Sequence, residues 1–194
     1  MKVGILAVQG DYEAHASALK RAGAEAAFVR TVADMRGIDA LILPGGESST
    51  QLQFLQEEKL DKAIKDFAHD GGAILGTCAG AILLAREVHG PDQKSLNLLD
   101  VSVERNAYGR QLASHVTQEP SKLSDRPLEM VFIRAPIIEK LGKKVEVLAE
   151  SEGHPVLVQQ GRILAATFHP ELTSDSTIHE YLLRVARNGK LHGK

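Results

Sequence analysis

The chain has 194 residues, of which 43% are hydrophobic and 25% are charged, and its formal net charge is −2 at pH 7. These values are ordinary for a globular protein, and the scattered Lys and Arg residues give no reason to expect a nucleic-acid or membrane-surface partner. The single cysteine cannot form an internal disulfide, and no apolar run reaches the roughly 18 residues of a membrane span, so we expect a cytoplasmic protein.

The first 87 residues alternate between apolar runs and helical patterns. The opening run, residues 2–8, is rich in branched side chains and is too short for a signal peptide, so it predicts a strand buried on both faces. Further strands are expected at 26–30, 39–46 and 72–77, and helices at 11–23, 48–68 and 79–87. This alternation predicts an α/β fold built on one doubly wound, mostly parallel sheet with helices on both faces.

The second half consists of short strand-like runs followed by a closing helix. Strands are expected at 98–106, 113–119, 128–134, 144–153, 154–161 and 162–169, and the helix at 174–190. We expect these strands to be antiparallel additions to the sheet. Because no linker or repeat interrupts the chain, residues 1–194 are expected to form a single domain. Three histidines, His15, His69 and His179, fall in helical patterns where we expect them to be exposed.

The only cysteine lies in "GTCAG", between an expected strand and an expected helix. Gly-x-Cys-x-Gly is the layout of a nucleophile elbow, in which a tight turn aims the central side chain outward. The N-terminus of the following helix favours an anion and therefore the thiolate form of Cys78, while the N–H group of Ala79 can donate to an oxyanion. A small buried residue at a tight turn would explain the same pattern, so a nucleophile also needs a base.

The segment "ATFHPEL", residues 166–172, can supply that base. His169 follows an apolar run at the end of an expected strand, and Glu171 comes two residues later. In an extended chain residues two apart point to the same side, and Pro170 favours extended geometry in the residue before it. A carboxylate beside an imidazole fixes its tautomer and stabilises the imidazolium. Taken alone, His169 is better explained as an ordinary polar residue.

The segment "PGGES", residues 44–48, closes the third expected strand. Its two glycines would let the backbone approach a ligand, although a turn that leads into a helix is the simpler interpretation. It lacks the Gly-Lys-Ser/Thr of a Walker loop. Because ligands bind beyond the carboxyl ends of parallel strands, "PGGES" and "GTCAG" can meet at one site.

Together these three segments resemble the class I, or triad, glutamine amidotransferases, a flavodoxin-like group of enzymes. The stretches "AVQGDYEAH", "LILPGGESST", "GTCAGAILLA", "RNAYGRQ", "FIRAP" and "ATFHPELTSDSTIHEY" are similar, in that order, to the family of glutaminase subunits of pyridoxal 5′-phosphate synthases. This resemblance covers residues 3 to 181, almost the whole chain.

The resemblance implies roles for individual residues. In the triad, Cys78 would be the nucleophile, His169 the general acid–base and Glu171 the orienting carboxylate. The residues implied in binding L-glutamine are Gly46, Glu47, Ser48, Arg105, Ile133 and Arg134. The oxyanion hole would be formed by the backbone of Gly46 and Ala79.

The resemblance also implies a reaction and a partner. L-Glutamine would be hydrolysed to L-glutamate and ammonia through a glutamyl thioester, and the ammonia would pass to a synthase (lyase) subunit, a (β/α)8 barrel, in a multi-subunit complex. We expect no cofactor and no metal in this chain. The family further implies that the free subunit depends on its partner. Our own hypothesis is that Gln9 and Asp11 lie near the site and help to transmit docking.

Three other interpretations stay open at this point. The same fold could carry a cysteine hydrolase for esters or lactones, which needs no paired arginines. It could also carry a thiol sensor, which would leave His169 and Glu171 unexplained. A glutaminase subunit of another synthase would share the triad, and only "RNAYGRQ" and "FIRAP" argue against it.

Overall fold

The computed structural model describes residues 1–106 and 114–190 and contains a nine-stranded sheet in the order β2-β1-β3-β4-β12-β11-β10-β7-β8. Its first five strands are β2 (Glu25–Val29), β1 (Lys2–Leu6), β3 (Ala40–Leu43), β4 (Ala73–Thr77) and β12 (Ile163–Ala166). All neighbours among these five are parallel. They form the doubly wound part of the fold that the sequence predicts, in a flavodoxin-like order.

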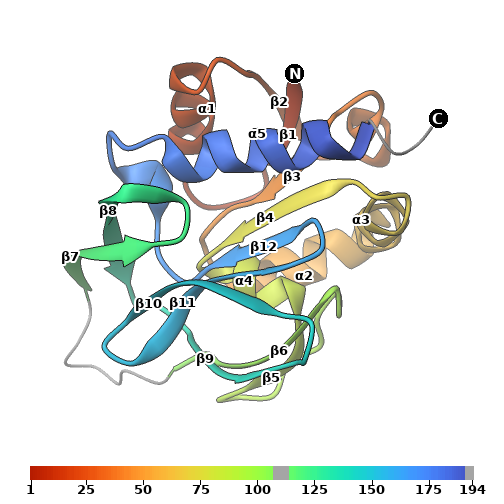
Figure 1. The fold of residues 1–194 in the computed structure, drawn as a ribbon. Coiled ribbons are helices and arrows are strands. Elements are labelled where there is room, and N and C mark those ends of the chain that lie inside the picture. Colours follow the sequence, from red (N-terminus) through yellow and green to blue (C-terminus); the bar gives the residue numbers. More distant parts are fainter. Residues whose placement is uncertain (107–113, 191–194) are drawn as a thin grey trace.

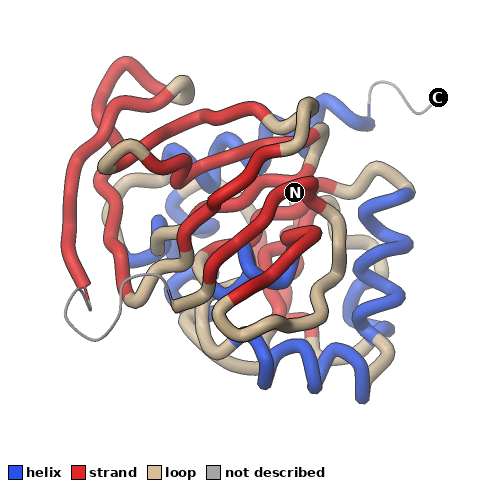
Figure 2. Tube along the Cα trace, turned by 90° about the horizontal axis from the view of Figure 1, so that it is seen from below, coloured by secondary structure: helices blue, strands red, loops and turns tan. Residues whose placement is uncertain are grey.

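The other four strands extend the sheet beyond β12, and each is antiparallel to its neighbour. They are β11 (His154–Gln160), β10 (Glu146–Ser151), β7 (Ser114–Ser121) and β8 (Ser124–Ile133). Four of the six strands expected in the second half are therefore confirmed as antiparallel additions, whereas the run at 162–169 forms β12, which is parallel to β4, and the run at 98–106 lies outside this sheet. Seen from below in Figure 2, the strands run side by side through the molecule, and helices lie to the outside.

Three further strands form a separate sheet, which corrects the expectation of a single sheet. Its order is β5-β6-β9, with β5 (Ala85–His89) parallel to β6 (Leu99–Glu104) and β9 (Ile137–Leu141) antiparallel to β6. The strand β9 was not predicted, because only one of its five residues is buried and the segment shows no apolar alternation.

Helices cover both faces of the main sheet (Figure 1). On one face, α1 (Tyr12–Arg21) and α5 (Thr177–Lys190) contribute Leu19 and Leu182 to one apolar core. On the other face, α2 (Ser48–Glu57), α3 (Leu60–His69) and α4 (Ala79–Leu84) pack into a second core, which also includes the small sheet. The alternation of side chains along each strand feeds both cores, as expected for a sheet covered on both sides.

Two predicted helices have different boundaries in the structure. The helix expected at 48–68 is divided into α2 and α3 by Lys59, whose φ of 59° lies in the left-handed region. The helix expected at 79–87 ends at Leu84, where the chain turns directly into β5. Residues 79–85 are all buried, so no change of apolar period marks this end.

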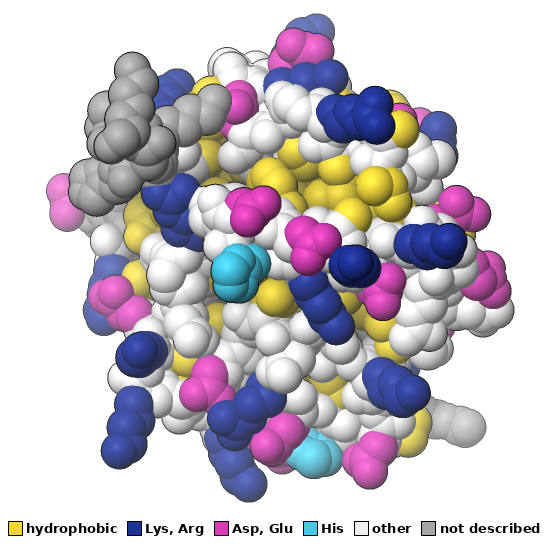
Figure 3. Space-filling view, turned by 90° about the vertical axis from the view of Figure 1, so that its right-hand side faces the viewer, with side chains coloured by type: hydrophobic (Ala, Val, Ile, Leu, Met, Phe, Trp, Pro, Cys, Tyr) yellow, Lys and Arg dark blue, Asp and Glu magenta, His cyan; other side chains and the backbone are white. Residues whose placement is uncertain are grey.

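Two short 3₁₀ turns, η1 (Val32–Met35) and η2 (Pro170–Leu172), complete the described part of the chain. No helix in the described part of the chain is long and apolar enough to cross a membrane. Figure 3 shows one face of the molecule, on which acidic and basic side chains are interspersed around a hydrophobic strip.

Candidate active site

The candidate site lies where four parallel strands end. Because β1, β3, β4 and β12 run in the same direction, the loops that follow them leave the sheet at one edge. These loops carry Asp11, Gly46, Cys78 and His169 respectively. The topology thus gathers residues that are far apart in the sequence.

The backbone at Cys78 is held in a strained turn between β4 and α4. Its φ of 48° and ψ of −104° are unusual for a residue with a side chain. The N–H of Cys78 donates to the carbonyl of Ala166 at 2.8 Å, which ties the ends of β4 and β12 together. A β-carbon on Gly80 would collide with the carbonyl oxygen of Leu43, so only glycine lets α4 start this close to β3. Cys78 as a whole is only 7% exposed.

His169 and Glu171 form a buried pair beside this turn. Nδ1 of His169 lies 2.7 Å from Oε1 of Glu171, and the two residues are 5% and 4% exposed. Because a carboxylate can only accept hydrogen bonds, His169 donates to Glu171 through Nδ1–H. The other ring nitrogen, Nε2, takes no part in this contact. The two side chains meet across the 3₁₀ turn η2 and not along the extended segment that we expected.

The surroundings of His169 favour its charged form. Burial by itself lowers the pKa of His169, but its contacts with Cys78 and Glu171 raise this pKa to about 10. A protonated imidazole can donate a proton to a leaving group and stabilise a thiolate opposite it. Nucleophilic catalysis by a thiol is therefore the chemistry that this arrangement fits best.

Gly45 is part of the site, although sequence reasoning gave it no individual role. A β-carbon built on Gly45 would collide with the imidazole of His169 and lie 3.5 Å from Cβ of Cys78. The missing side chain is what lets the loop after β3 pack on the triad. The next residue, Gly46, has φ of 140°, a conformation that side chains rarely adopt. The signal in the sequence was the pair of glycines at the end of a strand.

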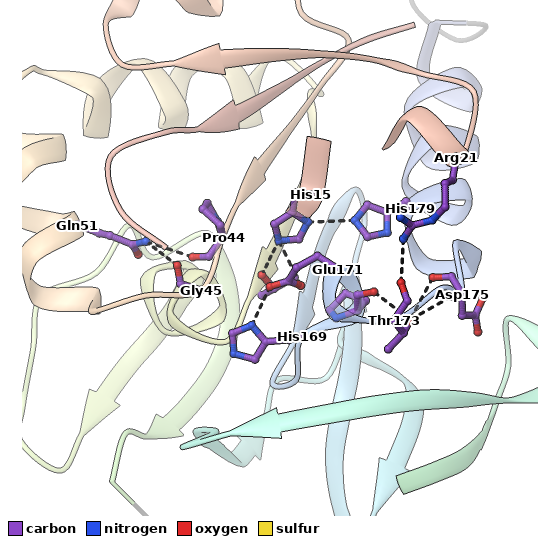
Figure 4. A network of polar contacts seen from close by, with 12 residues as sticks. His15, Arg21, Pro44, Gly45, Gln51, His169, Glu171, Thr173, Asp175 and His179 are labelled. Carbon is purple, nitrogen blue, oxygen red and sulfur yellow. Dashed lines mark hydrogen bonds and ion pairs between the residues drawn. The ribbon is translucent and has the colours of Figure 1, made fainter. Parts of the chain in front are cut away.

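Gln51, which we did not predict, holds this loop in place. Its side chain is fully buried, and Nε2 donates to the carbonyls of Gln9, Pro44 and Gly45 at 3.4, 3.3 and 3.2 Å (Figure 4). The side-chain amide of Gln9 also holds this loop, because its Oε1 accepts the N–H of Glu47 at 3.3 Å. Gln9 therefore lies against the loop after β3, at the position we expected.

Glu47 begins α2 and anchors Arg105. Its carboxylate accepts the N–H groups of Ser49 and Thr50 at 3.2 and 2.8 Å, and Nη2 of Arg105 lies 3.1 Å from Oε1. Although partial burial opposes it, these hydrogen bonds lower the pKa of Glu47 to about 2. The neighbouring Ser48 is buried and its hydroxyl donates to Oε1 of Gln93 at 3.0 Å.

The remaining predicted site residues lie around the same edge. The carbonyl of Ile133 is 3.8 Å from Sγ of Cys78, and Arg134 follows with φ of 46° and an exposed side chain. Ala79 opens α4 directly after the thiol. In "RNAYGRQ", residues 107–111 lie outside the described part of the chain.

Asp11 lies at the same edge, on the exposed side of the triad. Its carboxylate lies within 4.8 Å of donor atoms of both His169 and Glu171. This is the one group of three potential metal ligands among the described residues. Because Nδ1 of His169 already donates to Glu171, we interpret the group as a hydrogen-bonded pair with a third carboxylate nearby.

Two histidines that we expected to be exposed are instead fully buried behind the triad. His15 of α1 and His179 of α5 each have 0% exposure, whereas His69 is exposed as expected. Figure 4 shows His15 next to Glu171 and His179 beside His15. The helical period could have revealed this, because each histidine stands three and four residues before two core-facing apolar residues.

Comparisons with known proteins agree with this site. A model of the SNO glutamine amidotransferase family matches residues 5–188. The "Pyridoxal 5'-phosphate synthase subunit PdxT" of Koribacter versatilis is 50% identical over 189 residues, which are 97% of this chain and 97% of that protein. The protein of the same name from Thermus thermophilus is 50% identical over 187 residues, 95% and 97% of the two chains. A crystal structure described as a glutamine amidotransferase has a TM-score of 0.90 and 46% identity, and covers 95% of this chain and 98% of that one.

These similarities extend over nearly the full length of both chains, so they concern the whole fold and not a shared motif. The chain belongs to the SNO glutamine amidotransferase family. Its resemblance to class I glutamine amidotransferases and its doubly wound α/β fold are thereby confirmed. The roles of the individual site residues remain predictions.

Proposed function

We propose that one glutaminase domain, residues 1–194, hydrolyses L-glutamine to L-glutamate and ammonia for pyridoxal 5′-phosphate synthesis. The observation that carries this proposal is the placement of a thiol, an imidazole and a buried carboxylate at one edge of the sheet. Membership of a glutamine amidotransferase family supports the amide of glutamine as the substrate over an ester or lactone, and argues against a thiol sensor.

In this reaction the thiolate of Cys78 attacks the side-chain amide carbon of glutamine. Backbone N–H groups of Gly46 and Ala79 hold the oxyanion that forms. His169 gives a proton to the departing ammonia, and a glutamyl thioester remains on Cys78. The same imidazole then takes a proton from water, which attacks the thioester and releases glutamate. Glu171 keeps the proton-bearing Nδ1 of His169 in place throughout.

The free amino acid carries an α-carboxylate, which an arginine fork can bind through two oxygens. In our proposal Arg105 and Arg134 bind the α-carboxylate. The backbone of Ile133 and the loop formed by Gly46, Glu47 and Ser48 surround the substrate. Arg105 already stands at this edge through its ion pair with Glu47. When glutamine binds, the guanidinium of Arg105 would contact both the carboxylate of Glu47 and the α-carboxylate of the substrate.

Ammonia that escapes into water at neutral pH is protonated and lost as a nucleophile, so its consumer must dock nearby. Two relatives at 50% identity are named as subunits of pyridoxal 5'-phosphate synthase, which supports a synthase subunit as the partner. We propose that this partner is a (β/α)8 barrel in a multi-subunit cytoplasmic complex. Gln9 and Asp11 would transmit its docking, since Gln9 holds Glu47 and Asp11 lies beside the triad.

The decisive experiment measures glutamate released from L-glutamine by this chain with and without the synthase subunit. Activity that requires the partner and disappears in Cys78→Ala is expected. No glutamate from two folded and associated chains would overturn the proposal. Stimulation by a different synthase, and not by the one that makes pyridoxal 5′-phosphate, would show that this chain is the glutaminase subunit of that other synthase. An unchanged partner-dependent rate in Gln9→Ala would show that Gln9 does not transmit docking of the partner to the site.

A further inference from the structure

A buried polar chain continues from the triad into the helix layer formed by α1 and α5. Nδ1 of His15 lies 3.0 Å from Nε2 of His179, and Nε2 of His15 lies 3.1 Å from Oγ1 of Thr77. The same Nε2 is 3.4 Å from Oε2 of Glu171, the carboxylate oxygen that does not bond His169 (Figure 4). Every one of these side chains is fully buried.

The second oxygen of Glu171 decides which tautomer His15 must have. Oε2 is buried and has no hydrogen-bond partner among the described residues, and the nitrogen that faces it is Nε2 of His15. A bare ring nitrogen there would place two acceptors against each other in a dry environment. The tautomer of His15 with its proton on Nε2 avoids this, because an N–H group then faces Oε2 at 3.4 Å and Oγ1 of Thr77 at 3.1 Å, while Nδ1 accepts.

His179 can enforce this tautomer. When Nδ1 of His15 accepts, Nε2 of His179 must carry a proton, and Nδ1 of His179 is then bare. Nδ1 of His179 is buried and has no described partner, and the nearby cation of Arg21 favours a bare nitrogen over one that carries a proton. The polar chain then has one direction: His179 donates to His15, and His15 donates to Glu171.

The lowered pKa values of both histidines favour their neutral forms at pH 7, so neither competes as a cation with His169 for the carboxylate of Glu171. Burial is the main cause that lowers the pKa of His15 well below 6.5, and His179 and His169 lower it further. Burial and Arg21 lower the pKa of His179 to about 4, although Asp175 opposes them. The groups that face the pair are therefore Thr77, Glu171 and His169 around His15, and Arg21 and Asp175 around His179.

We propose that His15 is a positioning residue of the triad, which holds the second carboxylate oxygen of Glu171 through Nε2–H, and that His179 fixes the tautomer in which His15 can do so. This inference rests on the proposed triad. It assigns the two histidines a role in orienting His169 through Glu171, without contact with the substrate. The cost of burying two imidazoles is consistent with such a role.

Kinetics of the complex with the synthase subunit test this role. His15→Phe keeps the ring shape and removes both nitrogens, whereas His15→Gln can return an N–H group near the position of Nε2. We expect His15→Phe to lower kcat by about tenfold or more, part of what positioned acid–base catalysis contributes, with little change in KM. The alkaline limb of its pH profile should move to lower pH, because a displaced Glu171 no longer raises the pKa of His169 as far. His15→Gln should recover most of kcat.

Leu182→Ala is the matched control, because it removes a buried side chain from the same layer and no polar group of the chain. It should lower thermal stability and leave kcat and the pH profile in place. Full kcat in both His15 variants would overturn the inference while the wild-type activity still supports the proposed function. A wild-type complex without glutaminase activity would instead reject the proposed function itself.

The tautomers of His15 and His179 can be determined by NMR without measuring catalysis. Nitrogen-15 chemical shifts of the imidazoles in the full chain should show His15 and His179 neutral at pH 7 with their protons on Nε2. A proton on Nδ1 of His15, or a charged His15, would overturn the inference even if His15→Phe does not fold.

Discussion

Nδ1 of His169 lies 2.7 Å from Oε1 of Glu171, with both side chains removed from water. Since this contact is one of the causes that raise the pKa of His169 to about 10, Glu171→Gln should lower that pKa. Glutamine can also turn its NH₂ group toward Nδ1 and favour the wrong tautomer. We expect kcat for glutamine to fall by about 10²-fold or more.

The raised pKa of His169 also determines how stability should change with pH. In the wild type the imidazolium persists until the pH passes through about 10, so its stabilising contribution is complete below pH 6.5 and is lost as the pH rises toward 10. In Glu171→Gln this contribution should be smaller, and its loss should be complete at a lower pH. Titration of the His169 ring by NMR measures this directly. An unchanged titration midpoint would contradict a functional pairing of the two residues.

Gly45→Ala should impair catalysis more than it impairs folding. Gly45 does not have a positive φ, so alanine fits its backbone, but the new β-carbon would collide with the ring of His169. A displacement of the imidazole by about 1 Å costs on the order of 10²-fold in rate. We expect a loss of kcat of that order, measured as glutamate release by the complex.

Gly161→Ala separates backbone strain from this collision. Gly161 has φ of 58° and open space around its α-carbon, so alanine there costs about 1–2 kcal/mol of stability and touches nothing. Its kcat should remain at the wild-type value. Equal losses of activity in the two variants would show that general destabilisation, and not displacement of His169, explains Gly45→Ala.

The alternation of apolar runs and helical patterns was sufficient to predict the parallel sheet. The small sheet was not predictable in the same way. At Leu84 the chain passes from helix to strand inside an uninterrupted buried run, and no capping residue or change in period marks the transition. Lys59 likewise ends α2 with a left-handed backbone that a lysine gives no reason to expect.

At the site, the sequence located the residues that stand next to strand ends and missed those that act from inside helices. Cys78 and His169 are marked by their positions after apolar runs. Gln51 and His15 are polar residues in helical patterns, and their burial depends on which loops and helices pack over them. That information is tertiary, although the position of His15 next to the core-facing residues Ala18 and Leu19 carried a partial signal.

Gln51→Leu should destabilise the protein by about 1–3 kcal/mol, because the carbonyls of Pro44 and Gly45 lose a buried donor. Urea unfolding at pH 7 measures the change. The matched control is Gln53→Leu on the same helix, whose side chain is exposed and bonds only Glu57, and which should stay within about 0.5 kcal/mol of wild type. Similar stabilities for the two variants would mean that Gln51 does not anchor the loop.

The carboxylate of Glu47 should stabilise the fold in a pH-dependent way. Its pKa is lowered from 4.5 to about 2, mainly by hydrogen bonds from Ser49 and Thr50 that outweigh partial burial. A lowered pKa in the folded state gives stability that is present above pH 4.5 and is lost as the pH falls through about 2. Because the side chain is nearly half exposed, solvent screens the gain, and Glu47→Gln should cost only about 0.5–1 kcal/mol at pH 7.

Unfolding by urea at a series of pH values from 7 down to 2.5 follows this loss. The stability difference between wild type and Glu47→Gln should shrink steadily below pH 4.5, because the wild-type carboxylate becomes neutral while glutamine is neutral throughout. Glu146→Gln is the control, since its exposed ion pair with Lys122 lies away from the site and contributes little. A constant difference between wild type and Glu47→Gln across this range would mean that the shape of the cap, and not its charge, stabilises the start of α2.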